Sequence, residues 1–132
     1  MKSSLNINQL SSKRSFNING YLFEYEKPLV MGILNMTPDS FYDGGKYNSI
    51  NSAISRIEGM INNGASIIDI GGCSTRPGSD IITIEEEWKR VGGIIKECSI
   101  RFKDTLFSVD TFRSEIARRS LEEGIHIIND VS

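Results

Sequence analysis

The feature that most constrains the fold of this chain is an alternation of strand and helix patterns that occurs three times and ends on a fourth strand. Short continuous apolar runs, typical of strands buried on both faces, are each followed by apolar residues at helical spacing. The predicted strands are Leu29 to Leu34, Ile67 to Ile70, Leu106 to Val109 and Ile125 to Ile128. This order predicts a parallel sheet covered by helices, either doubly wound or a (β/α)₈ barrel.

The predicted helices carry start and stop signals that support the alternation. The first apolar stripe, residues 50–61, is followed by Gly64, where a helix C-cap belongs. The second helix is expected to begin at Thr83, because its spacing to Glu86 is that of a capping box. The third stripe covers residues 112–121. Each helix is therefore placed between two strands, as a parallel sheet requires.

The N-terminal region lies outside this alternation. Apolar residues alternate on both sides of Asn19-Gly20 within residues 15–25, which predicts a β-hairpin with a type I′ turn. Residues 1–14 are polar and are expected to form a disordered leader before a domain at residues 15–132. Four strands are half of a barrel that usually has about 250 residues. We therefore expect the 132-residue chain to be a truncated N-terminal half.

Composition argues against several function classes. The 15 basic and 17 acidic residues are spread along the chain, so no basic cluster indicates a nucleic-acid partner. No apolar run approaches the ~18 residues that cross a bilayer, so no membrane partner is expected. No GxGxxG follows the first strand, which disfavours a dinucleotide site. Cys73 and Cys98 cannot complete a zinc site with His126, and they predict reduced thiols in a cytoplasmic protein.

Polar residues follow the carboxyl ends of all four predicted strands, where parallel α/β folds bind ligands. These residues are Asn35 and 37–41, Asp69 and 71–78, Asp110 and Thr111, and Asn129 and Asp130. Asn35 offers a neutral oxygen suited to Mg²⁺ that bridges to a phosphate, and Arg76 offers a planar fork for phosphate oxygens. Asp110 can accept ring N–H bonds or stabilise a cation, while Asn129 suits the mixed edge of a heterocycle. The pattern predicts a heterocycle deep in the mouth and a phosphate-like group near the rim.

Other conspicuous residues have structural interpretations. We expect Asp69 to hold a neighbouring loop by hydrogen bonds, and Trp88 to pack a helix on the sheet. His126 is interpreted as a packed or solvent-facing side chain, and Cys73 as a bystander in its loop.

Four ordered segments resemble the motifs of the dihydropteroate synthase family. They are residues 31–41 with 43–45, residues 64–65, 68–72 and 74–78, residues 108–111, and residues 128–132. The resemblance implies a (β/α)₈ barrel closed below by the hairpin. It also implies Mg²⁺-dependent displacement of pyrophosphate from 6-hydroxymethyl-7,8-dihydropterin diphosphate by p-aminobenzoate, which gives 7,8-dihydropteroate for folate biosynthesis. Sulfonamides are the expected inhibitors, and a homodimer is the expected state of the full-length protein.

By position, the resemblance gives each predicted residue a role. Asp110 and Asn129 would bind the pterin, and Asn35 would help to hold Mg²⁺ and pyrophosphate. The p-aminobenzoate site would comprise Asp39, Phe41, Ser74, Thr75, Arg76 and Pro77, with Thr75 and Arg76 also near the pyrophosphate. The predicted catalytic residues are Asp110, Asp39 and Arg76. Because the family's other pterin-binding residues lie on later strands, we expect the isolated chain to be nearly inactive.

Two alternatives remain open. A pterin-binding methyltransferase barrel would share the Asp and Asn of the third and fourth strands, but it is not expected to carry segments 37–41 and 74–78. A non-catalytic half-barrel would act only through a partner chain that pairs with its open strand edges.

Overall fold

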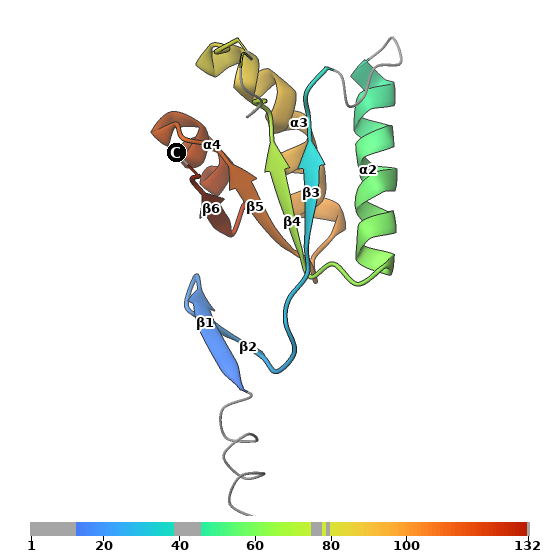
Figure 1. The fold of residues 1–132 in the computed structure, drawn as a ribbon, viewed down its shortest axis with the longest axis vertical. Helices are drawn as coiled ribbons and strands as arrows, with labels where there is room; N and C mark the ends of the chain where they lie inside the picture. Colours follow the sequence, from blue (N-terminus) through green and yellow to red (C-terminus); the bar gives the residue numbers. More distant parts are fainter. Residues whose placement is uncertain (1–12, 39–45, 75–77, 79, 132) are drawn as a thin grey trace, which may run out of the picture.

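Four parallel strands, each paired with the strand next in sequence, form the centre of the molecule (Figure 1). They are β3 (Met31–Asn35), β4 (Ile67–Gly71), β5 (Leu106–Asp110) and β6 (Ile127–Asn129). The structure is a computed structural model that describes residues 13–38, 46–74, 78 and 80–131, without the side chains of 46–48. The predicted parallel sheet is confirmed: each strand ends one residue later than expected, and β3 and β6 also begin two residues later.

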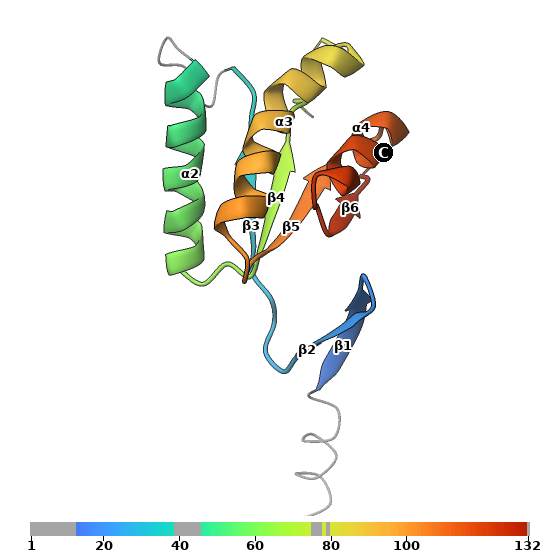
Figure 2. The ribbon, with the colours of Figure 1, turned by 180° about the vertical axis from the view of Figure 1, so that it is seen from behind.

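Three helices cover one face of this sheet (Figure 2). They are α2 (Lys46–Asn62), α3 (Ile84–Arg101) and α4 (Ser114–Glu122). The predicted cap of α3 is confirmed, because the Thr83 hydroxyl accepts a hydrogen bond of 3.1 Å from the Glu86 amide. Gly64 and Gly124 have φ of +106° and +104°. This left-handed conformation ends the preceding helices at little steric cost. No helix in the described ranges is long and apolar enough to cross a membrane.

The core lies between the helices and the helix-facing side of the sheet. Alternate strand residues point to opposite faces, so one half of each strand contributes to this layer. The fully buried members include Leu34, Ile68, Ile70 and Val109 from the strands and Ile57, Val91, Ile94, Ile95 and Ile116 from the helices. Trp88 packs against this cluster, as predicted.

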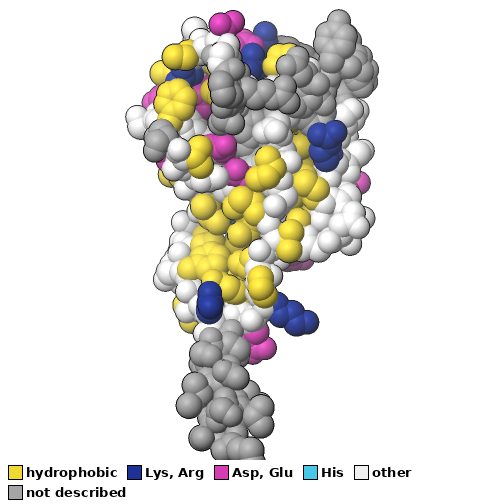
Figure 3. Space-filling model, viewed as in Figure 1, with side chains coloured by type: hydrophobic (Ala, Val, Ile, Leu, Met, Phe, Trp, Pro, Cys, Tyr) yellow, Lys and Arg dark blue, Asp and Glu magenta, His cyan; other side chains and the backbone are white. Residues whose placement is uncertain are grey.

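The opposite face of the sheet differs from the prediction of strands buried on both sides. Only β4 is buried at all five positions, while β3 exposes alternate residues, among them Ile33 at 54%. Within the described residues no second layer covers this face, and Figure 3 shows apolar side chains gathered on it. Two residues of the third predicted apolar stripe do not belong to the core. Phe112 precedes α4 and is 55% exposed, and Leu121 is half exposed.

The predicted hairpin is confirmed as β1 (Arg14–Ile18) and β2 (Tyr21–Tyr25). Asn19 and Gly20 both have positive φ, at 51° and 85°, as a type I′ turn requires. The hairpin lies beyond the amino ends of the sheet strands (Figure 1). Its two strands are packed together by aromatic rings: the ring centroid of Phe16 lies 5.1 Å from that of Phe23 and 5.8 Å from that of Tyr25. The arrangement agrees with the hairpin and first four strands of a (β/α)₈ barrel.

Candidate active site

The predicted ligand-binding residues align at one level across the four strands. Strand pairing places Asn35 opposite Gly71, Gly71 opposite Asp110, and Asp110 opposite Asn129. Neighbouring strands lie about 4.8 Å apart, so this row brings the Asp110 and Asn129 side chains next to each other. Gly71 contributes no side chain to the row, and a Cβ there would lie 3.5 Å from the Asp110 Cβ, in ordinary van der Waals contact.

One level below the row, Asp69 fixes the orientation of Asn129. Asp69 is only 3% exposed, and its carboxylate accepts hydrogen bonds from the Ser108 hydroxyl at 2.5 Å and from the Asn129 side-chain nitrogen at 3.1 Å. The Asn129 amide therefore turns its nitrogen toward Asp69, which leaves its oxygen to accept from another group. Asp69 has the predicted structural role, but its partners are side chains of β5 and β6 rather than a loop.

Asp110 lies in an environment that disfavours its charge. Burial raises the pKa of its carboxyl group, and the negative charges of Asp69, Glu87 and Asp130 raise this pKa further. A group that donates to Asp110, or a cation formed beside it, would relieve this repulsion. The site is thus built to receive N–H donors or developing positive charge.

A cavity of about 320 Å³ opens beside the row, which is the size range of small-molecule sites. It is lined by Cys73, Ser74, Asp110, Thr111, Phe112, Asp130 and Val131. The structure thus brings Ser74, a predicted p-aminobenzoate residue, to the same cavity as Asp110. The other loop residues of that prediction, Asp39, Phe41, Thr75, Arg76 and Pro77, lie outside the described residues.

The predicted metal residue, Asn35, stands at the far end of the row with an exposed side chain. Among the described residues no group of three or more His, Cys, Asp or Glu side chains could hold a metal by itself. A cation at Asn35 would take its other ligands from water and substrate phosphate. The amide oxygen of Asn35 is of the donor type that Mg²⁺ prefers, which is oxygen.

Sequence reasoning missed a buried acidic residue behind the row. Glu87 of α3 is 1% exposed, and its carboxylate accepts from the Thr111 hydroxyl at 2.7 Å and from the Arg113 guanidinium at 3.1 Å. Burial raises the pKa of the Cys73 thiol to about 11, and the nearby Glu87 charge contributes to this rise. The signal was present, because Glu87 falls three residues after Ile84 on the apolar stripe of its helix.

The only histidine of the chain serves packing, as predicted. The His126 Nδ1 atom accepts a hydrogen bond of 3.0 Å from the Phe107 amide. Burial lowers the pKa of His126, which keeps the ring neutral and Nδ1 free to accept.

Comparison with known proteins agrees with the geometry. A family model described as pterin binding enzyme matches residues 31–132. The chain is 50% identical over 114 residues to a probable bifunctional folylpolyglutamate synthase/dihydropteroate synthase of Halobacterium salinarum. The matched region covers 86% of this chain and 14% of that protein. It is 48% identical over 118 residues to the dihydropteroate synthase of Clostridium beijerinckii. That match covers 89% of this chain and 41% of that enzyme.

A solved structure has the same fold. The dihydropteroate synthase of Xanthomonas albilineans, determined with 4-aminobenzoic acid, superposes with a TM-score of 0.80 at 38% identity. The match covers 90% of this chain and 43% of that one. The chain thus spans less than half the length of the proteins it matches.

Proposed function

Because the chain belongs to the family of pterin-binding enzymes, we propose that it supplies the first half of the active site of a dihydropteroate synthase. The reaction joins 6-hydroxymethyl-7,8-dihydropterin diphosphate to p-aminobenzoate. The amine nitrogen bonds to the pterin CH₂ carbon, the bond from that carbon to the diphosphate oxygen breaks, and the amine loses a proton. The products are 7,8-dihydropteroate and pyrophosphate. The observation that carries the proposal is the aligned row of Asn35, Gly71, Asp110 and Asn129.

Asp110 and Asn129 are the proposed pterin residues. A pterin ring presents N–H donors beside ring-nitrogen acceptors, and this row offers a carboxylate beside an amide. The hydrogen bond from Asn129 to Asp69 favours an orientation in which the Asn129 oxygen accepts from the ring. Gly71, which pairs with Asp110, adds no side chain beside it.

The Asp110 carboxylate is also the proposed electrostatic catalyst. As the bond to the leaving diphosphate lengthens, positive charge develops on the pterin and its CH₂ group. Asp110 favours this charge, because the substrate then neutralises a carboxylate that burial and nearby acids hold in an unfavourable state. The expected contribution is greater in the transition state than in the ground state, which is the condition for a higher rate.

Asn35 is the proposed protein contact for Mg²⁺ and pyrophosphate. When bound, Mg²⁺ would neutralise charge on the leaving diphosphate. The part of Asn35 is to supply a neutral amide oxygen at the exposed end of the row, away from Asp110. This separation keeps the phosphate end of the substrate apart from the carboxylates.

The arylamine site is proposed for the loops after β3 and β4, through Asp39, Phe41, Ser74, Thr75, Arg76 and Pro77. Its support is the position of Ser74 on the cavity that Asp110 also lines. Sulfonamides, which resemble p-aminobenzoate, would compete there. We also propose a cytoplasmic homodimer for the full-length protein, without a nucleic-acid or membrane partner.

The test is pyrophosphate release by the full-length protein that contains this chain, with both substrates and Mg²⁺. Asp110→Asn should lower kcat by about 100-fold or more, as expected when an electrostatic stabiliser is removed. Asp104→Asn, an exposed residue before β5, is the matched control and should leave the rate unchanged. Wild-type protein that binds no pterin and releases no pyrophosphate would refute the proposal. The purified 132-residue chain should release almost none.

A further inference from the structure

The turn that follows β5 is fastened by the hydroxyl group of Thr111, which takes part in no step of the reaction proposed above. Thr111 comes directly after Asp110 and is 5% exposed. Its side chain points toward α3, on the opposite side of the sheet from Asp110, as expected for neighbours in an extended segment. There the hydroxyl group donates a hydrogen bond of 2.7 Å to the carboxylate of Glu87, which is 1% exposed.

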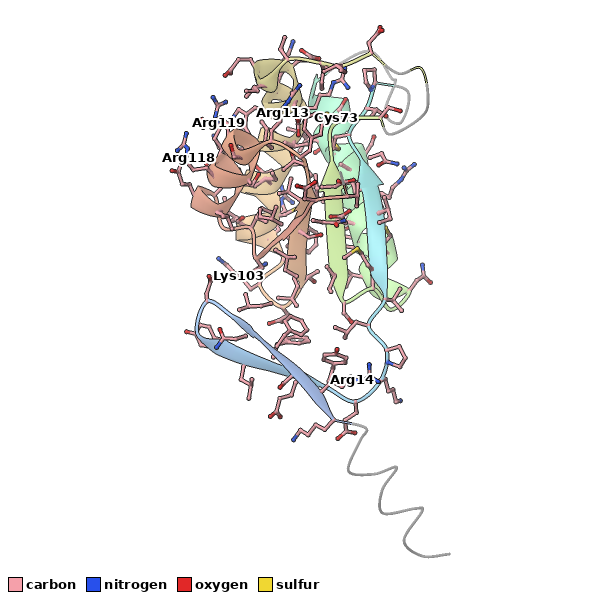
Figure 4. All side chains as sticks on the ribbon, turned by 60° about the vertical axis from the view of Figure 1, so that its left-hand side comes forward. Arg14, Cys73, Lys103, Arg113, Arg118 and Arg119 are labelled. Atoms are coloured by element: carbon pink, nitrogen blue, oxygen red, sulfur yellow. The ribbon has the colours of Figure 1, made fainter. Side chains whose placement is uncertain are left out.

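Two further hydrogen bonds meet at Thr111. Its hydroxyl oxygen accepts from the backbone amide of Arg113 at 3.2 Å, and its own backbone amide donates to the carbonyl of Asn129 at 3.2 Å. The guanidinium group of Arg113 returns to the same Glu87 carboxylate at 3.1 Å, and Figure 4 shows Arg113 at the carboxyl end of the sheet. Residues 111–113 are therefore held on Glu87 by a closed set of bonds, and this set also reaches the backbone of Asn129.

We propose that Thr111 is a positioning residue for the pterin site, and that its hydroxyl group, held by Glu87, fixes the backbone between Asp110 and Asn129. The inference rests on the proposed function, which assigns the pterin to the last two side chains. The single hydrogen of the hydroxyl group goes to Glu87, so Thr111 acts through the neighbouring backbone and not by donating to the substrate. Accurate placement matters, because a shift of about 1 Å in a group that holds substrate can lower the rate about 100-fold.

Thr111→Val removes the hydroxyl group and keeps the branched shape of the side chain. Glu87 retains its ion pair with Arg113, so no buried charge is left without a partner. In the full-length protein, the Kd for the dihydropterin diphosphate should rise about tenfold. KM for p-aminobenzoate, measured at saturating dihydropterin diphosphate, should change less than about twofold. Thr111→Ser restores the hydroxyl group and should keep both constants within about twofold of the wild type.

Thr105→Val is the matched control, because it makes the same change before the other end of β5, where Thr105 is 8% exposed. It should leave the Kd for the dihydropterin diphosphate unchanged, whatever it does to Tm. A residue that serves stability alone would behave in the same way at position 111. The inference is therefore overturned if Thr111→Val binds the pterin substrate as tightly as the wild type, if Thr111→Ser binds it as weakly as Thr111→Val, or if both constants rise equally.

Hydrogen exchange tests the same inference without substrate. In Thr111→Val the amide of residue 111 still has the Asn129 carbonyl as its acceptor, so faster exchange there reports a loosened turn and not a deleted bond. This amide should exchange about tenfold faster than in the wild type, while the amides of β3 and α2 are unchanged. Unchanged exchange at residue 111, or an equal increase in every element, would contradict the inference.

A milder variant covers the case in which Thr111→Val does not fold. Thr111→Cys replaces the hydroxyl group by a thiol, which is a weak donor. It should show both effects in smaller degree, with a rise of about threefold in the Kd and in the exchange rate at residue 111, and wild-type values of both would refute the role of Thr111. If the wild-type protein binds no dihydropterin diphosphate, the proposed function fails, and the exchange result alone decides whether Thr111 fixes this turn.

Discussion

Replacing Asp69 by Asn tests whether this residue, one level below the row, orients the proposed pterin site. The carboxylate of Asp69 accepts two hydrogen bonds, at 2.5 Å from Ser108 and at 3.1 Å from Asn129. An Asn side chain keeps one acceptor oxygen but turns an NH₂ group toward the other donor. One bond to a charged group is lost and a buried donor is left unpaired, which costs about 3 kcal/mol. Less repulsion at Asp110 offsets part of this cost, so the expected loss is about 2 kcal/mol.

The assay is urea denaturation of the full-length protein, combined with binding of the dihydropterin diphosphate. The free energy of unfolding should fall by about 2 kcal/mol, a large part of the ~5–15 kcal/mol that stabilises a domain. The Kd for the pterin substrate should rise about tenfold, because Asn129 no longer has a fixed orientation. The pKa of Asp110 should fall, since the charge of Asp69 is the second-largest cause that raises it.

Ser108→Ala is the matched control, because it removes the other hydrogen bond and leaves the bond from Asn129 intact. It should cost about 1–3 kcal/mol of stability and leave the Kd for the pterin unchanged. If Asp69→Asn binds the pterin as tightly as the wild type does, the orientation of Asn129 does not depend on Asp69 and the reasoning is wrong.

Three further predictions concern charge and packing. Asp110→Asn should raise Tm at pH 7 while it removes activity, because the raised pKa of Asp110 means that its ionised form destabilises the fold. The pKa of His126 is lowered in the folded protein, so the unfolded chain binds a proton at this residue more readily. The urea midpoint should therefore fall as the pH drops below about 6.5, and His126→Gln should reduce that dependence. Gly72→Ala would place a Cβ 2.9 Å from Val91 and should destabilise by about 1–3 kcal/mol in urea denaturation, whereas Gly59→Ala, which meets nothing within 4 Å, should stabilise.

The order of the elements could be predicted because local patterns determine it. Asn19-Gly20 requires a particular turn, and the Thr83 hydroxyl caps α3 through a bond to a residue three positions away. The row at the strand ends could also be predicted, since parallel strands place their carboxyl ends at one edge. These features depend on residues close in sequence, or on a rule that applies to every strand.

The partners of the buried acids could not be predicted in the same way. Asp69 and Asn129 are 60 residues apart, and their contact depends on the register of three strands. The exposure of Ile33 escaped prediction for a related reason. An apolar run identifies a strand, but the number of layers that cover it is a property of the whole fold.

The pairing of each strand with the next one in sequence has a consequence for synthesis on the ribosome. Each new strand can add to the free edge of the strands already made, without waiting for a distant part of the chain. The row is then completed in the order Asn35, Gly71, Asp110, Asn129. We expect the nascent chain to acquire the proposed magnesium contact first and the proposed pterin contacts last. A ribosome-bound intermediate ending before β6 would then hold Asp69 without the donor that Asn129 later supplies.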